Sequence, residues 1–210
     1  DIRGIAHDEL DEEFANRLGK ALGTFLSASN IAVGRDIRES SPSLHSAFVT
    51  GLMQSGVNVH DLGICTTGTL YHATSVLEVD GGVMITASHN PPEYNGFKMC
   101  RGTAAMAGRE IQDLRETFEC GEFMSPDIFG EHLILEGFVD QHLDAVISAT
   151  GPITRPVNVV IDAANAVPGP FLVSVAEKLG TTGIALHCEW DNTFPHHAPD
   201  PTRPKNMIDL

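Results

Sequence analysis

A serine and a histidine stand side by side at Ser88 and His89, directly after the apolar run GVMIT at residues 82–86. Large apolar and β-branched residues predict that this run is a buried strand. In α/β proteins, functional side chains gather where such strands end. Ser88 is therefore a candidate nucleophile or phosphate carrier. His89 and Lys98 follow closely enough in the chain to line the same pocket.

These residues also allow two other interpretations. Ser88 and Asn90 also fit an ordinary turn, in which their side chains satisfy backbone groups. A serine hydrolase is disfavoured, because the base of such an enzyme normally comes from a distant segment and the sequence contains no GxSxG elbow. The residues of the loop alone leave the choice between a turn and a phosphate carrier open.

The segments around this loop alternate between strand and helix patterns. Apolar residues recur three and four positions apart in the helical segments, and Ser40, Ser41 and Pro42 offer a cap and a first-turn proline for one of them. This alternation predicts a layered α/β domain, a sheet with flanking helices. Helices are expected over residues 8–27, 41–55, 67–78 and 108–120, and strands over 30–33, 57–62, 82–86 and 96–100.

A second, incomplete α/β domain is expected after an irregular stretch. Residues 119–136 contain Gly121, Pro126 and Gly130 and lack periodicity. The predicted domains are therefore residues 1–134 and residues 135–210. In the second, helices are expected at 138–148 and 169–179, and strands at 157–162 and 184–189. The order of its elements matches that of residues 30–62, which fits an internal duplication or simply two βαβ units.

Charge and composition exclude several classes of partner. The chain has 13 Lys and Arg against 28 Asp and Glu, a net charge of -15, which disfavours nucleic acid and anionic lipid as partners. No apolar run approaches the ~20 residues of a membrane-spanning helix, so no membrane association is expected. We expect a cytoplasmic location. The four cysteines lack the spacing of a zinc site or a disulfide framework. No obligate protein partner is inferred.

Three motifs resemble those of one enzyme family. Residues 86–98 read TASHNPPEYNGFK, which closely resembles the phosphoserine loop of the α-D-phosphohexomutases. Residues 1–4, DIRG, resemble the opening motif of that family, and residues 33–42, VGRDIRESSP, resemble its next motif. The resemblance covers essentially all 210 residues and is strongest to the bacterial phosphomannomutase/phosphoglucomutase group.

The second domain matches the family less closely. Residues 160–166, VIDAANA, stand where the family has a DxxNG strand end, with Ala166 in place of the glycine. Residues 191–201, DNTFPHHAPDP, resemble DGxFPNHxPDP, with Asn192 for glycine and His196 for asparagine. These departures put the local loop conformation or the substrate fit in doubt, rather than the class of reaction.

The resemblance implies a phosphohexomutase that interconverts hexose 1-phosphate and hexose 6-phosphate. Ser88 would carry the transferable phosphoryl group, and a hexose 1,6-bisphosphate would be both intermediate and activator. Arg3 and Lys98 would stabilise charge, move the proton of the reacting hydroxyl and bind the substrate together with His89, which would orient the site. The implied cofactor is Mg²⁺, with the phosphate on Ser88 as its one ligand from this chain. The alternatives are a disordered terminus for Arg3 and a solvated strand residue for Lys98.

Some family motifs do not occur in these residues. The magnesium loop DGDxDR and the sugar motif GExSGH are absent from the 210 residues, so we expect an N-terminal fragment that is inactive alone. Phosphoglucosamine mutase and a non-catalytic sugar-phosphate-binding homologue are the alternative functions.

Three further residue assignments follow from the charged and histidine-rich segments. Arg35 and Arg38 are expected to pair with Asp36 or Glu39 in a structural role. The adjacent histidines at 196 and 197 point apart on an extended chain, which disfavours a metal site built on that pair.

Overall fold

The computed structural model describes residues 1–210 as two compact units. The first unit comprises residues 1–87 and 93–136, and the second comprises residues 88–92 and 137–210. The short segment that begins at Ser88 is thus grouped with the second unit, although it follows a strand of the first. No helix in the structure has both the length and the apolar character needed to cross a bilayer.

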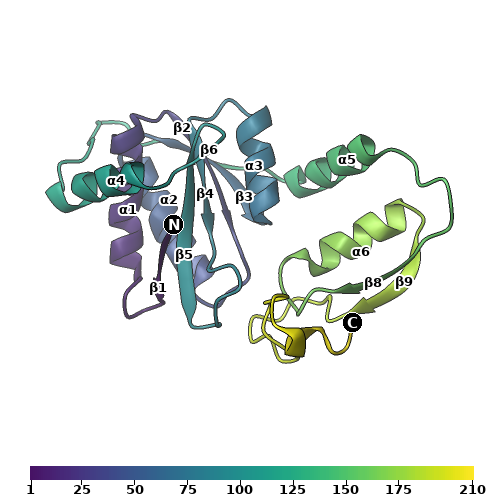
Figure 1. Ribbon diagram of the computed structural model, residues 1–210. Helices are drawn as coiled ribbons and strands as arrows, with labels where there is room; N and C mark the ends of the chain where they lie inside the picture. Colours follow the sequence, from purple (N-terminus) through teal and green to yellow (C-terminus); the bar gives the residue numbers. More distant parts are fainter. The chain divides into compact units, whose positions relative to one another are not determined.

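A mixed seven-stranded sheet forms the centre of the first unit (Figure 1). Strands β4, β2, β3 and β7 are parallel to one another, whereas β5 runs antiparallel to both β1 and β4. Side by side, the strands are β1 (Ile2–Ile5), β5 (Tyr94–Arg101), β4 (Gly81–Ile85), β2 (Asn30–Arg35), β3 (Asn58–Ile64) and β7 (His132–Ile134), and β6 (Ala104–Ala105) pairs with β5.

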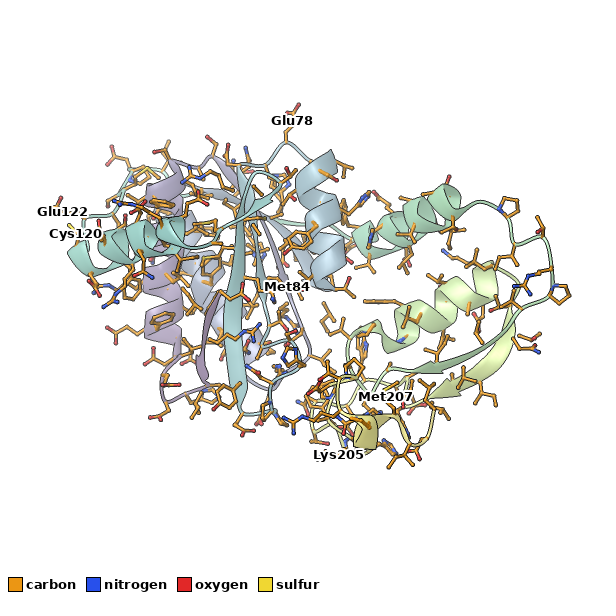
Figure 2. All side chains as sticks on the ribbon, in the orientation of Figure 1. Glu78, Met84, Cys120, Glu122, Lys205 and Met207 are labelled. Atoms are coloured by element: carbon orange, nitrogen blue, oxygen red, sulfur yellow. The ribbon has the colours of Figure 1, made fainter.

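Helices cover both faces of this sheet, which confirms the predicted layered α/β class. Helices α1 (Glu12–Leu26), α2 (Ser41–Gln54) and α4 (Arg109–Cys120) lie on one face, and α3 (Thr67–Val76) lies on the other (Figure 1). The main core lies beneath α1 and α2 and includes Leu18, Leu22, Phe48 and Phe97. Figure 2 labels Met84 on the buried strand β4 and Cys120 at the exposed end of α4.

Two glycines let α1 and α2 approach closely. A Cβ atom on Gly19 would meet the carbonyl oxygen of Phe48, and a Cβ atom on Gly51 would meet the carbonyl oxygen of Asn16. Both obstacles are backbone atoms, which cannot swing away as a flexible side chain can. Each glycine is therefore needed where the two helices cross, and the crossing holds α2 against the sheet.

The sequence expectations needed four corrections in this unit. Helix α1 begins at Glu12 rather than residue 8, because Asp11 caps it by accepting a hydrogen bond from Phe14 N at 2.7 Å. Ser40 precedes α2 but makes no side-chain cap bond. The strands β1 and β7 were not predicted, since each has only three or four residues and β7 is exposed along its length.

The second unit is built around a smaller parallel sheet. Strands β8 (Asn158–Asp162) and β9 (Thr182–Leu186) pair in parallel, and α6 (Pro168–Lys178) connects them. Helix α5 (Phe138–Thr150) contacts α6, and a short 3₁₀ helix, η1 (Pro204–Met207), follows. The two predicted strands and the two predicted helices of this region are present, with ends that differ from the prediction by at most three residues.

A buried carboxylate ties α2 and β7 to the sheet of the first unit. The two oxygens of Asp61 on β3 lie 3.1 Å from His45 Nε2 on α2 and 2.8 Å from His132 Nε2 on β7. Gly63 N also donates to this carboxylate, at 2.8 Å. Burial alone would raise the pKa of Asp61, but the bonds and charge of His45, together with Gly63 and His132, hold it well below its ordinary value.

Replacing Asp61 with asparagine is expected to flatten the acid side of the stability profile. Because the pKa of Asp61 is lower in the folded state, the unfolded state binds more protons between the two pKa values. The contribution of this carboxylate is thus complete above about pH 4 and is lost as the pH falls towards the folded-state pKa. Urea midpoints followed by circular dichroism should fall less steeply with acid in the variant, while the exposed control Asp127→Asn should keep the wild-type slope. Equal slopes in all three proteins would contradict this assignment.

Candidate active site

Ser88 lies just beyond the end of a fully buried strand. All five residues of β4 are buried, and Thr86 N extends the pairing with β5 by donating to Gly96 O at 2.9 Å. Thr86 and Ala87 are also buried, whereas Ser88 and His89 are exposed. The chain therefore leaves the core at Ser88 and presents its hydroxyl outward.

The backbone of Ser88 is held in an uncommon conformation. Its φ of 58° lies in the left-handed region, which residues other than glycine seldom adopt and which recurs at functional sites. Ser88 Oγ lies 3.4 Å from His89 Nδ1, which is long for a hydrogen bond. His89 thus lies beside the Ser88 hydroxyl.

The two predicted cations, Arg3 and Lys98, meet at one carboxylate. Arg3 lies on β1 opposite Gly96 of β5, and Lys98 lies on β5 opposite Met84 of β4. The Asp1 carboxylate accepts from Arg3 Nη2 at 3.2 Å and from Lys98 Nζ at 3.0 Å. Arg3 belongs to a paired strand rather than a disordered terminus, and Lys98 is only partly exposed. The register of three strands, β1, β5 and β4, therefore brings these cations together.

A buried polar network fixes the strand that returns from the serine loop. Asn95 is fully buried, and its Nδ2 donates to Ser40 Oγ at 2.8 Å and to Ser41 Oγ at 2.9 Å. The carboxamide oxygen of Asn95 accepts from Gly96 N at 2.8 Å. The hydroxyl of Ser40 therefore supports the loop instead of capping α2, which explains why the predicted cap is missing.

Arg38 joins this network through the residue that precedes Asn95. Its Nε donates to Asp36 Oδ2 at 3.1 Å, and its Nη1 donates to the carbonyl oxygen of Tyr94 at 3.1 Å. The Arg38 side chain is 1% exposed, so the ion pair is buried. Arg35 Nη1 donates to the backbone carbonyl of Asp36 at 3.2 Å. The expected pairing of Arg38 with Asp36 is confirmed, whereas the partner found for Arg35 is a backbone group.

Ser88 and His89 line a cavity of about 390 Å³. Asp162 lies at the end of β8, and His197 Nε2 lies 2.9 Å from its Oδ2. This second carboxylate and histidine were not among the candidate site residues, because nothing in the local sequence links positions 162 and 197 to Ser88. The cavity is lined by Ser88, His89, Asp162, Ala163, Ala164, Ala166, Pro168, His197, Pro199, Asp200, Pro201 and Met207.

The departures from the family motifs in the second unit suit its backbone. Positive φ angles occur at Ala164 and Asn165 but not at Ala166, so the residue that replaces the family's glycine needs no glycine conformation. Asn192 likewise has no positive φ. His196 Nδ1 lies 2.8 Å from Asn165 Oδ1, so the histidine that replaces an asparagine is held by a hydrogen bond. None of the three substituted positions, Ala166, Asn192 and His196, has a left-handed backbone that would call for glycine.

Comparisons with known proteins identify the family. The model of phosphoglucomutase/phosphomannomutase α/β/α domain I matches residues 1–124, and that of domain II matches residues 137–210. The chain belongs to the phosphoglucomutase/phosphomannomutase family, the α-D-phosphohexomutases. The predicted family is thus confirmed.

Individual relatives agree with the family models. A phosphomannomutase/phosphoglucomutase of Pseudomonas aeruginosa is 41% identical over 214 residues, which cover all of this chain and 45% of that protein. A phosphoglucomutase of Neisseria meningitidis serogroup B is 41% identical over all of this chain and 46% of its own length. The crystal structure of a family protein from Burkholderia thailandensis superposes with a TM-score of 0.94 at 35% identity, over all of this chain and 47% of that one. The chain spans about half the length of the relatives it matches.

Proposed function

We propose that this chain supplies the phosphoserine site of a phosphohexomutase that interconverts hexose 1-phosphate and hexose 6-phosphate. The observation that carries the proposal is the placement of Ser88, exposed and left-handed at the end of the buried strand β4. Relatives named for mannose and for glucose phosphates favour these two sugars as substrates. The proposed substrate is thus a small hexose phosphate, and the proposed location is the cytoplasm.

The proposed reaction consists of two phosphoryl transfers. In the first, the bond between phosphorus and Ser88 Oγ breaks, and a bond forms from phosphorus to the free hydroxyl of a hexose monophosphate. Lys98 relays the proton of that hydroxyl to Ser88 Oγ, so that the serine leaves as a hydroxyl and Lys98 stays cationic, and the product is a hexose 1,6-bisphosphate. In the second, the bisphosphate presents its other phosphoryl group, the bond from that phosphorus to the sugar oxygen breaks as a bond to Ser88 Oγ forms, and Lys98 relays the serine proton to the departing sugar oxygen.

Charge neutralisation is the main task proposed for the cations. A phosphoserine carries about -1.5 to -2 charges, and the chain as a whole carries -15. The site therefore needs local cations to hold the phosphoryl group. Arg3 and Lys98 already converge on an anion, the Asp1 carboxylate, and a transferring phosphoryl group would compete for the same donors. His89, beside the Ser88 hydroxyl, is proposed to orient it and to contact the sugar phosphate.

Magnesium is proposed as the cofactor, because phosphohexomutases are typically Mg²⁺-dependent. Mg²⁺ prefers six oxygen ligands. Asp162 and Asp200 line the same cavity as Ser88, but Asp162 accepts from Ala164 N and His197, and Asp200 accepts from Thr202 and Arg203. These residues do not form an oxygen cage for Mg²⁺. The phosphate on Ser88 is the only ligand proposed from this chain.

The direct test is to look for the phosphoryl group on Ser88. The protein encoded by the complete gene, incubated with glucose 1,6-bisphosphate, should gain about 80 Da on the peptide that contains Ser88. Ser88→Ala should abolish the gain. Ser75→Ala, which removes an exposed helical hydroxyl that donates to His72 O, should leave it intact. An unmodified Ser88 peptide in the wild-type protein, or label that persists in Ser88→Ala, would overturn the proposal.

A further inference from the structure

Three side chains able to bind a metal converge at the carboxyl ends of β8 and β9. One donor atom from each of Asp162, His187 and His197 lies within 4.8 Å of the other two. Asp162 is the last residue of β8 and is paired with Leu186 of β9, so the next residue, His187, emerges beside it. His197 arrives from the loop that follows β9, and its Nε2 lies 2.9 Å from Asp162 Oδ2. Parallel strand register and one loop therefore assemble the cluster within the second unit.

His187 contains a buried nitrogen with no hydrogen bond. Its Nε2 is shielded from solvent and has no hydrogen-bond partner. The carboxylate of Asp209 lies 3.6 Å from this nitrogen, which is beyond hydrogen-bonding distance. The backbone of His187 is also left-handed, with a φ of 50°. A buried polar atom without a partner calls for an explanation, and a bound ion is one of the few that satisfy it.

The other two ligands are already oriented by their surroundings. His197 Nδ1 lies 3.0 Å from the carbonyl oxygen of Ala198, and because a carbonyl can only accept, Nδ1 carries the hydrogen. A metal can therefore replace the proton on Nε2. Asp162 Oδ1 accepts from Ala164 N at 2.9 Å, which leaves Oδ2 directed at His197. Metal-binding histidines and carboxylates typically form such a hydrogen bond to the backbone through the atom that does not contact the metal.

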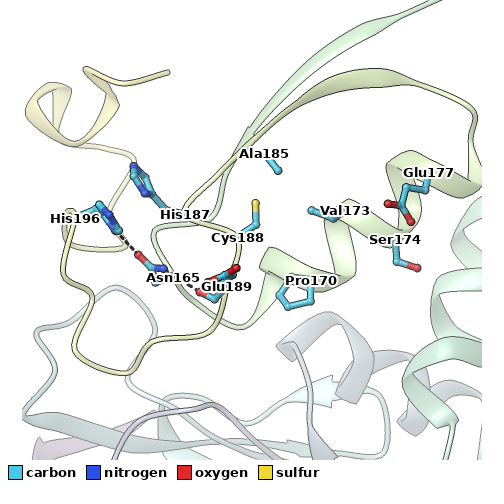
Figure 3. A pocket seen from close by; sticks show the side chains of 10 residues that line it. All are labelled: Asn165, Pro170, Val173, Ser174, Glu177, Ala185, His187, Cys188, Glu189 and His196. Carbon is cyan, nitrogen blue, oxygen red and sulfur yellow. Dashed lines mark hydrogen bonds between the residues drawn. The ribbon is translucent and has the colours of Figure 1, made fainter.

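His196 supports the cluster from outside. Its ring stacks on that of His187, with centroids 3.8 Å apart, and its Nδ1 lies 2.8 Å from Asn165 Oδ1. Figure 3 shows His196 and His187 side by side, with the bond from His196 to Asn165 dashed. The two adjacent histidines thus have different partners, as expected for an extended chain, and only His197 joins the ligand set.

We propose that Asp162, His187 and His197 bind a divalent transition-metal ion such as Zn²⁺, which ties the loop of residues 191–201 to the ends of β8 and β9. Two imidazoles and one carboxylate suit Zn²⁺, Co²⁺ or Ni²⁺, whereas Mg²⁺ prefers an all-oxygen shell. The ion would displace the proton between His197 and Asp162 and give the buried nitrogen of His187 a partner. This site is separate in chemistry from the magnesium proposed for phosphoryl transfer.

Titration with Co²⁺ tests the site, because Co²⁺ bound by nitrogen and oxygen ligands absorbs visible light. In a large excess of Mg²⁺, which fills the proposed magnesium site, the protein encoded by the complete gene should bind one equivalent of Co²⁺, which Zn²⁺ displaces and the Mg²⁺ does not. His187→Gln, His197→Gln and Asp162→Asn should each weaken binding by more than about 100-fold, beyond the range typical of outer-sphere substitutions. His196→Gln, which removes a neighbouring imidazole outside the ligand set, should weaken it less than any of these.

Two further measurements keep the test decisive. Ser88→Ala should bind Co²⁺ as the wild-type protein does, which excludes a metal held by the phosphate on Ser88. If a ligand variant fails to fold, histidine ring signals in the unsubstituted protein decide the question, because Zn²⁺ should shift those of His187 and His197 and leave that of His45 unchanged. Absence of these shifts, equal binding by the ligand variants, or displacement by Mg²⁺ would each overturn the site.

Discussion

Replacing Ser88 with alanine is expected to lower the turnover of mannose 1-phosphate and glucose 1-phosphate by at least about 10³-fold. The reason is that Ser88 is the exposed hydroxyl beyond the end of β4, whereas Thr86, the other hydroxyl there, is buried. Without Oγ, the phosphoryl group has no covalent carrier. The loss should therefore appear in kcat rather than in KM, measured with the protein encoded by the complete gene and a bisphosphate activator.

The control for this prediction is another serine that lies outside the loop. Ser75 is exposed on α3 and donates to His72 O, so Ser75→Ala should retain most of the wild-type rate. Circular dichroism should show that both variants are folded, since the exposed Ser88 side chain contributes little packing. If Ser88→Ala keeps more than roughly a tenth of the wild-type kcat, the carrier lies elsewhere and the covalent mechanism is wrong.

The sequence was most informative about β4 and Ser88, because the candidate serine follows its strand directly in the chain. The run GVMIT predicted β4, and Ser88 was expected directly after this strand, where the structure exposes it. The proximity of Arg3 and Lys98 was expected from the family resemblance alone. Their positions are 95 apart in the chain, and only the antiparallel pairing of β1 with β5 places both beside Asp1. Local sequence periodicity does not predict the register between strands so far apart in the chain.

Helices were easier to predict than short strands, for a physical reason. A helix such as α1 repeats its apolar stripe over several turns, so its existence is clear even though its capping residue, Asp11, shifted the start. Strand β7 has three exposed residues and is specified by its pairing with β3 and by the bond from His132 to Asp61. Those contacts come from residues about 70 positions away. The cluster of Asp162, His187 and His197 was missed for the same reason.

Ser40 shows how a correct local rule can be overridden. The sequence SSP before α2 has the composition of a helix cap, and Pro42 does lie in the first turn. The Ser40 hydroxyl instead accepts from Asn95, a residue of the strand that returns from the serine loop. A buried amide in a low-dielectric interior requires partners, and that requirement outweighs one cap bond. The motif at residues 33–42 therefore supports the serine loop indirectly, through the hydrogen bond between Ser40 and Asn95.

Because this network is buried, Arg38→Met is expected to destabilise the protein strongly. Removing the guanidinium leaves the Asp36 carboxylate without its buried ionic partner and the carbonyl of Tyr94 without a donor. Breaking a buried pair from one side typically costs about 3–5 kcal/mol. The transition of the first unit should move down by roughly 10 °C or more in a thermal scan. Arg109→Met, whose side chain is 88% exposed in its pair with Asp113, should cost less than about 1 kcal/mol.

The double variant Asp36→Asn, Arg38→Met separates a structural role from a phosphate-binding one. If the arginine mainly neutralises Asp36, removing that negative charge as well should recover part of the lost stability, as a positive coupling in a double-mutant cycle. An arginine kept for binding phosphate would behave differently, because Arg38→Met would leave the melting temperature unchanged and raise KM. A buried guanidinium that donates to Tyr94 O holds the backbone immediately before Asn95. Loss of stability should therefore be accompanied by weaker phosphorylation of Ser88, since the same network fixes the strand that returns from the serine loop.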